Sequence, residues 1–100
     1  DGIDGVYVGP SDLGLSLGHE PTLDPTAPEV IDAIARIAAR TRAAGRVAGV
    51  HTGSPAMVRA MLDKGFHFAS LLTDVRLFTN ALAKSLAEVR DTRAETVSGY

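Results

Sequence analysis

The sequence contains no cysteine, which excludes a disulfide framework and any metal site with thiolate ligands. An excess of charge is also lacking, because the net charge of −2 cannot form an electrostatic surface for nucleic acid or an anionic membrane. No apolar run is long enough to span a bilayer, and the first residues lack the basic and apolar regions of a secretion signal. We therefore expect a cytoplasmic protein that contacts neither nucleic acid nor membrane.

What the sequence does contain is an alternation of short apolar segments and amphipathic helices. Buried strands are predicted at residues 5–9, 46–51 and 66–73, because each segment is short and largely apolar. Helices are predicted at residues 29–44, 54–65 and 74–89. Gly45 and Gly65 are expected to end the first two, and Ser54 is expected to cap the second with Pro55 at its first position. A shorter helical turn at residues 13–17 follows Ser11 or Asp12 as its N-cap. The order is strand, helix, strand, helix, strand, helix.

Apolar strands that alternate with amphipathic helices predict an α/β fold with a parallel sheet covered by helices. Three such units suit either half of a doubly wound sheet or the last part of a (β/α)8 barrel. In both architectures the chemistry lies at the C-terminal ends of the strands, which selects residues 9–13, 51–54 and 73–74. Residues 1–5 form a loop that leads directly into the first strand, so residues 1–90 are expected to be the C-terminal part of a larger domain. Residues 91–100 are polar and aperiodic, and a disordered tail is expected there.

The turn Gly9-Pro10-Ser11-Asp12 places a carboxylate at the mouth of the first strand. It also aims the backbone N–H groups of a short helix at the same place. A carboxylate binds a hard divalent cation, and free N–H groups at a helix start bind an anion. The alternative, left open by the residues alone, is that Asp12 only caps the helix.

Other polar residues near the strand ends carry weaker signals. His51 ends the second strand and should face the same mouth, whereas His67 within the third strand is better explained by structure than by catalysis. His19 lies in a loop, where it is expected to be solvated. Asp74 is interpreted as a helix N-cap. The segment Thr52-Gly53-Ser54 could cradle a phosphate, although Ser-Pro is also common at helix starts without any ligand. A non-catalytic module that binds phosphate or another anion therefore stays an alternative.

Residues 4–13, followed by residues 16–19, resemble the signature of the class II, metal-dependent pyruvate aldolases. These enzymes form the HpcH/HpaI aldolase/citrate lyase family, which includes 4-hydroxy-2-oxoheptanedioate aldolase and 2-dehydro-3-deoxyglucarate aldolase. The similarity continues through residues 44–49 and the strand that ends at Asp74, to about residue 89. The resemblance implies a (β/α)8 TIM barrel of which the three predicted strands are strands six to eight.

For the site, the resemblance implies that Asp12 is one of two acidic ligands of a Mg²⁺, Mn²⁺ or Co²⁺ ion. The backbone N–H groups of Ser11 and Asp12, in the turn with Gly9 and Pro10, would receive the carboxylate of pyruvate. The metal would act as a Lewis acid on the keto group. The family's second acidic ligand and its catalytic Arg and His are expected upstream of Asp1.

The activity implied is that of a carbon–carbon lyase, which cleaves a 4-hydroxy-2-oxo acid to pyruvate and an aldehyde. Related enzymes of the citrate lyase or malyl-coenzyme A lyase type are the alternative. The family assembles as trimers or hexamers, so a homo-oligomer is expected, and the chain alone is expected to be inactive. One departure stands out, because His51 occupies a place where the family commonly presents an apolar residue to the aldehyde pocket. We expect His51 to tune the choice of aldehyde.

Overall fold

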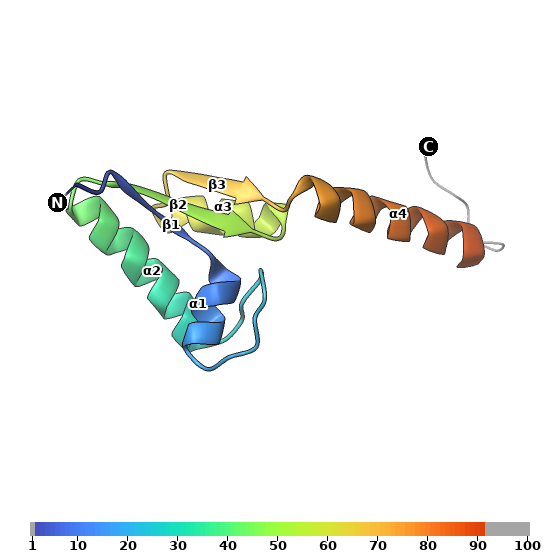
Figure 1. Cartoon of the computed structure of the whole chain (residues 1–100), viewed down its shortest axis with the longest axis horizontal. Coiled ribbons are helices and arrows are strands. Elements are labelled where there is room, and N and C mark those ends of the chain that lie inside the picture. The colour runs from blue at the N-terminus through green and yellow to red at the C-terminus, as the bar shows by residue number, and fades with distance from the viewer. Residues whose placement is uncertain (1, 92–100) are drawn as a thin grey trace.

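The computed structural model describes residues 2–91, and its strands and helices follow the predicted order (Figure 1). The predicted tail lies outside the described residues except for Asp91, which is the last residue of the final helix. The elements are β1 (Gly5–Val8), α1 (Pro10–Ser16), α2 (Pro28–Ala43), β2 (Val47–Thr52), α3 (Pro55–Asp63), β3 (Phe68–Leu71) and α4 (Asp74–Asp91).

The three strands form one parallel sheet in the order β1-β2-β3, which confirms the prediction of parallel strands. In the register between β1 and β2, Tyr7 lies beside Gly49 and Val8 beside Val50. Between β2 and β3, His51 lies beside Ser70. Because neighbouring residues of a parallel register point to the same side, these pairs define the two faces of the sheet.

The two faces of the sheet have opposite environments. Val8, Ala48 and Val50 are buried against helices α1 to α3. On the other face, the side chains of Tyr7 and Phe68 are 55% and 47% exposed. A doubly wound sheet carries helices on both faces, whereas a barrel carries them on the outside only. The arrangement therefore matches a segment of a barrel, whose inner face bears Tyr7 and Phe68.

Helix α2 packs one stripe of buried side chains against the sheet. Its buried residues, Val30, Ile34, Ala38 and Thr41, recur every three or four positions and so form one stripe. Complete burial of a Val or Ile side chain contributes about 1.5–3 kcal/mol. Thr41 has a polar group in this stripe, and its Oγ donates to the carbonyl of Ile37 at 2.6 Å. The stripe is thus compatible with an apolar core throughout.

The third strand is shorter than predicted, because both of its predicted ends have other roles. Phe66 follows Gly65 in a turn that ends α3, where the Phe66 N–H donates to the Met61 carbonyl at 3.2 Å. Phe66 and Met61 are both buried, so this turn is anchored in the core. At the other end, Leu72 adopts a φ of 51°, which takes the chain out of the extended conformation.

Helix α4 leaves the end of β3 and projects away from the other elements (Figure 1). None of its residues is buried. Its apolar side chains are exposed, among them Phe78 at 70% and Val89 at 72%. In proteins, most of the stability of a helix comes from the packing of its apolar face. Its apolar stripe therefore requires a partner surface that the described residues do not provide.

Candidate active site at the strand ends

The turn after β1 differs from its prediction at the helix N-cap. Helix α1 begins at Pro10, and its N-cap is Gly9 instead of Ser11 or Asp12. Proline suits the first helical position because its φ is already helical and its missing N–H would have no partner there. Asp12 thus lies in the first turn of the helix, and the interpretation of Asp12 as a cap is wrong.

The N-terminus of α1 leaves two backbone donors open. The N–H of Leu13 is the first to find a helical acceptor, the carbonyl of Gly9 at 2.9 Å. Pro10 has no N–H, and no side chain caps this end. The N–H groups of Ser11 and Asp12 consequently have no partner among the described residues and point toward the end of the strand.

The Asp12 carboxylate lies beside this same end of the strand. Its Oδ2 atom is 3.6 Å from the position that a Cβ atom on Gly9 would occupy. The side chain is exposed and makes no hydrogen bond or ion pair with the described residues. No cluster of three His, Cys, Asp or Glu residues that could hold a metal occurs within residues 2–91. Asp12 is thus the carboxylate that the described residues place free of partners at the end of β1.

His51 lies on the neighbouring strand at the same level as this turn. Val8 and Val50 are paired in register, so Gly9 and His51 are the next residues of adjacent strands. His51 shares the inner face with Ser70, whose Oγ is 2.7 Å from its Nδ1. The structure therefore brings together the two parts of the predicted site, the turn after β1 and the histidine of β2.

Two functional candidates on this face were missed by the sequence reasoning. The hydroxyl of Tyr7 is 2.5 Å from Ser70 Oγ, so Ser70 connects Tyr7 to His51. The Tyr7 ring stacks on Phe68 with ring centroids 5.9 Å apart, and the Phe68 ring covers Gly49. The alternation of side chains along each strand places Tyr7 and Ser70 on one face, but only the register shows that both meet His51.

The remaining histidines have structural contacts. His67 Nδ1 accepts the N–H of Ala48 at 2.9 Å, which fixes the start of β3 against β2 and agrees with the structural interpretation. Its Nε2 lies 3.2 Å from Arg42 Nη1, so both ring nitrogens of His67 have contacts within the fold. Contrary to expectation, His19 is not merely solvated, because its Nε2 lies 2.6 Å from Glu29 Oε1. That contact links the loop after α1 to the start of α2.

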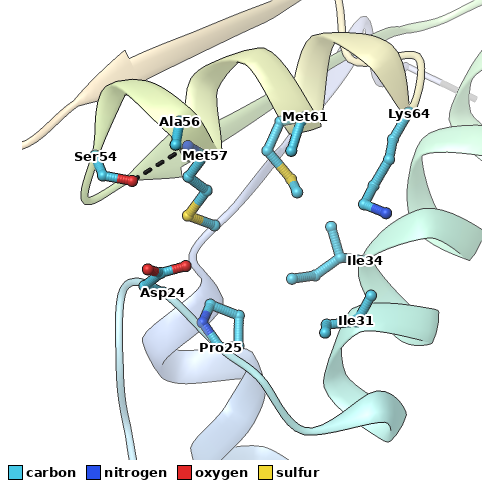
Figure 2. Close-up of a pocket in the computed structure, with 10 residues that line it drawn as sticks. Asp24, Pro25, Ile31, Ile34, Ser54, Ala56, Met57, Met61 and Lys64 are labelled. Atoms are coloured by element: carbon cyan, nitrogen blue, oxygen red, sulfur yellow. Dashed lines mark hydrogen bonds between the residues drawn. The ribbon is translucent and has the colours of Figure 1, made fainter.

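The segment proposed as a phosphate cradle is engaged in internal contacts. Thr52 is completely buried and its Oγ donates to the Ser70 carbonyl at 2.9 Å. A Cβ atom on Gly53 would lie 2.9 Å from Leu23 Cβ, so the loop that contains Leu23 covers the backbone of Gly53. Ser54 Oγ accepts the N–H of Met57 at 3.1 Å, which confirms Ser54 as the N-cap of α3 (Figure 2). These contacts disfavour the alternative of an anion-binding module.

The turn after β3 also differs from its prediction. Asp74 is the first residue of α4, and the N-cap is Thr73, whose Oγ accepts the N–H of Arg76 at 3.2 Å. Asp74 Oδ1 accepts the N–H of its neighbour Val75 at 2.7 Å. The carboxylate at this third mouth therefore serves the helix start.

A cavity of about 330 Å³ lies between α2 and α3, beneath the loop that carries Asp24 and Pro25 (Figure 2). Its walls include Ile34, Met57 and Met61, which belong to the layer of helices. This cavity lies on the outer face of the sheet, opposite the face of His51. We therefore place the candidate site at the strand ends.

Comparison with known proteins shows the family to which the chain belongs. The sequence profile of the HpcH/HpaI aldolase/citrate lyase family matches residues 1–81. The chain belongs to this family. It is 41% identical over 90 residues to the hydroxypyruvate/pyruvate aldolase of Rhizorhabdus wittichii, and this alignment covers 90% of the chain and 36% of that protein. It is 40% identical over 95 residues to the 2-keto-3-deoxy-L-rhamnonate aldolase of Klebsiella pneumoniae, covering 95% of the chain and 35% of that protein.

Solved structures of family members share the fold. A family protein from Burkholderia cenocepacia superposes with a TM-score of 0.79 at 36% identity, covering 90% of the chain and 34% of that protein. An HpcH/HpaI aldolase from Desulfitobacterium hafniense gives a TM-score of 0.80 at 21% identity, over 97% of the chain and 37% of that protein, which shows the fold alone. The chain thus spans about a third of the length of its relatives, as a segment of their (β/α)8 barrel. None of the helices described in residues 2–91 has the length and apolar character needed to cross a membrane.

Proposed function

We propose that the protein containing this chain is a metal-dependent pyruvate aldolase. It cleaves a 4-hydroxy-2-oxo acid to pyruvate and an aldehyde. The family assignment supports an aldolase, and the similar proteins from Rhizorhabdus wittichii and Klebsiella pneumoniae are both named aldolases. These names favour the aldolase over an enzyme of the citrate lyase or malyl-coenzyme A lyase type.

The observation that carries the proposal is the position of Asp12. Its carboxylate is exposed at the end of β1 and has no partner among the described residues, which suits a ligand of Mg²⁺, Mn²⁺ or Co²⁺. A bound divalent cation would supply Lewis-acid polarisation of the substrate's keto group. Asp12 provides one ligand, and further ligands would come from outside the described residues.

The same turn would bind the substrate carboxylate. The open N–H groups of Ser11 and Asp12 follow Gly9 and Pro10, so a carboxylate at the strand end could accept both hydrogen bonds. His51, on the neighbouring strand, would then face the aldehyde half of the substrate. The pyruvate half and the aldehyde half would thus be bound by adjacent strands.

An Asp12→Asn variant of the whole protein tests the proposal. Asparagine keeps the shape of the side chain but removes the charge that binds a cation, so Mn²⁺ affinity and deuterium exchange into pyruvate should both fall by at least tenfold. Asp63→Asn is the matched control, because Asp63 is exposed and ends α3, where the chain returns to the start of β3 at the opposite edge of the sheet. Normal exchange and metal affinity in Asp12→Asn would leave Asp12 with only a favourable interaction with the α1 dipole, of about 0.3–1 kcal/mol.

We also propose that the whole protein is a homo-oligomer, a trimer or hexamer, in which a second copy covers α4. The exposed apolar stripe of α4, which includes Phe78, supports this proposal. Phe78→Asp should shift the sedimentation coefficient to that of a smaller species. The proposal would be wrong if that variant kept the assembly and α4 formed no crosslink to another subunit. The helix would then pack on its own barrel. Residues 1–100 alone should not exchange pyruvate protons, because Asp12 is the one carboxylate at the strand ends that makes no hydrogen bond among the described residues.

A further inference from the structure

Three side chains on the inner face of the sheet form a continuous hydrogen-bonded chain. Ser70 Oγ lies 2.5 Å from the Tyr7 hydroxyl and 2.7 Å from His51 Nδ1. The three residues come from three adjacent strands, and the Tyr7 ring is held in place by its stack on Phe68. His51 Nε2 has no partner among the described residues. The series of hydrogen bonds thus ends at His51, whose Nε2 atom is free to bind a ligand beside the turn after β1.

The chemistry of the three groups sets the direction of the hydrogen bonds. A phenol is a better donor than an aliphatic hydroxyl, and an imidazole nitrogen is a better acceptor than either oxygen. Tyr7 therefore donates to Ser70, and Ser70 donates to Nδ1 of His51. The reverse direction would use the weak phenol oxygen as the final acceptor and leave its proton without a partner. Bonds arranged head to tail in this way also strengthen one another.

We propose that Tyr7 and Ser70 are positioning residues that hold His51 in the tautomer with its proton on Nε2. His51 then donates one hydrogen bond from Nε2 to the hydroxyl oxygen on the carbon next to the aldehyde carbonyl. A donor at this place favours an aldehyde with a hydroxyl group next to the carbonyl over an alkyl aldehyde of the same size. This inference rests on the proposed aldolase function, and it adds a preferred class of aldehyde and two residues that secure it.

The test compares glycolaldehyde with propanal, which match in size but differ in the hydroxyl group. In the whole protein we expect Ser70→Ala to lower the ratio of kcat/KM for glycolaldehyde to that for propanal by about three- to tenfold, the range of one hydrogen bond. Most of the loss should lie in KM for glycolaldehyde. Tyr7→Phe, which keeps the stacked ring, should shift the ratio in the same direction. Ser70→Thr should restore it because the hydroxyl returns.

A spectroscopic readout separates positioning from a purely structural role. Nitrogen-15 spectra of histidine-labelled protein should show His51 protonated on Nε2, and Ser70→Ala should convert part of it to the other tautomer. His51→Gln identifies the signal, and Ser85→Ala, an exposed hydroxyl on α4, is the control that should change neither readout. An unchanged tautomer and an unchanged aldehyde ratio in Ser70→Ala would overturn the relay.

Deuterium exchange into pyruvate distinguishes failure of this inference from failure of the proposed function. If the unmodified protein exchanges pyruvate protons but Ser70→Ala keeps the aldehyde ratio, the relay alone is wrong. If the unmodified protein does not exchange, the aldolase proposal is wrong and the aldehyde contact is overturned with it. A lower ratio, a mixed tautomer and rescue by Ser70→Thr together support the inference.

Discussion

The packing of Phe68 over Gly49 makes a substitution at Gly49 informative. A Cβ atom at Gly49 would lie only 2.2, 2.4 and 2.7 Å from three atoms of the Phe68 ring. Ordinary contacts between such atoms are near 3.5–4.0 Å, so Gly49→Ala requires the ring to move. Phe68 is 47% exposed, so the described residues leave space for its ring to rotate without moving the backbone.

The cost of this movement follows from what the ring leaves behind. The stack of Phe68 on Tyr7 contributes about 0.5–1.5 kcal/mol beyond its buried area. With the strain of the added methyl group, we expect Gly49→Ala to destabilise the whole protein by about 1–2 kcal/mol. In a scanning calorimeter this corresponds to a fall in Tm of roughly 2–8 °C.

A double-mutant cycle attributes the loss to the ring. In a Phe68→Ala background the clash is gone, so Gly49→Ala should cost almost nothing there. Gly14→Ala is a matched control, because its Cβ would meet only the Glu20 carbonyl at an ordinary 3.7 Å, and alanine favours the helix by about 0.5–1 kcal/mol. An equal cost of Gly49→Ala with and without the Phe68 ring would refute the reasoning.

Three further outcomes are expected for the whole protein. Gly45→Ala should destabilise it by about 1–2 kcal/mol in denaturant unfolding, because Gly45 has a φ of 73° and open space around it, so only the backbone resists the change. Ser54→Ala should cost about 1 kcal/mol in the same assay, through loss of the bond to the Met57 N–H. Removal of divalent cations with a chelator should abolish pyruvate exchange, and added Mn²⁺ should restore it without refolding.

Much of the fold follows from local signals in the sequence. Gly45 and Gly65, predicted to end helices, adopt φ values of 73° and 107°. Ser54 caps α3, and Pro55 occupies its first turn as predicted. These positions obey rules that depend on a few adjacent residues, such as the conformational freedom of glycine and the capping preference of serine. The alternation of apolar strands with helices likewise predicted the parallel sheet.

The predictions that failed concern the exact residues at which helices and strands begin and end. Gly9 is the N-cap of α1 and Thr73 is the N-cap of α4. Asp12 and Asp74 therefore lie inside the first turns of these helices. The ends of β3 were misplaced because Phe66 packs in the core and Leu72 has a positive φ. Apolar character alone does not separate a strand residue from one that closes a helix.

The least predictable feature of the site was the contact among Tyr7, Ser70 and His51. Tyr7 and Ser70 lie 63 residues apart in the sequence, and no local pattern connects them. Side-chain alternation restricts each to one of two faces, but the exact register decides whether their hydroxyl groups meet. A shift of one residue in either strand would turn the side chain to the helical face.

Under the proposed roles, the pyruvate half and the aldehyde half of the substrate are bound by different parts of the fold. The pyruvate half relies on the turn after β1, where backbone N–H groups and one carboxylate are set by the helix start at Pro10. The aldehyde half relies on side chains of three strands, so it can change by substitution at Ser70 or His51 without disturbing that turn. Tyr7 belongs to the aldehyde half although it lies on β1, because its hydroxyl contacts Ser70. Substitutions of Ser70 or His51 should therefore alter aldehyde choice and leave deuterium exchange into pyruvate unchanged, whereas substitutions in the turn at Gly9 should lower both.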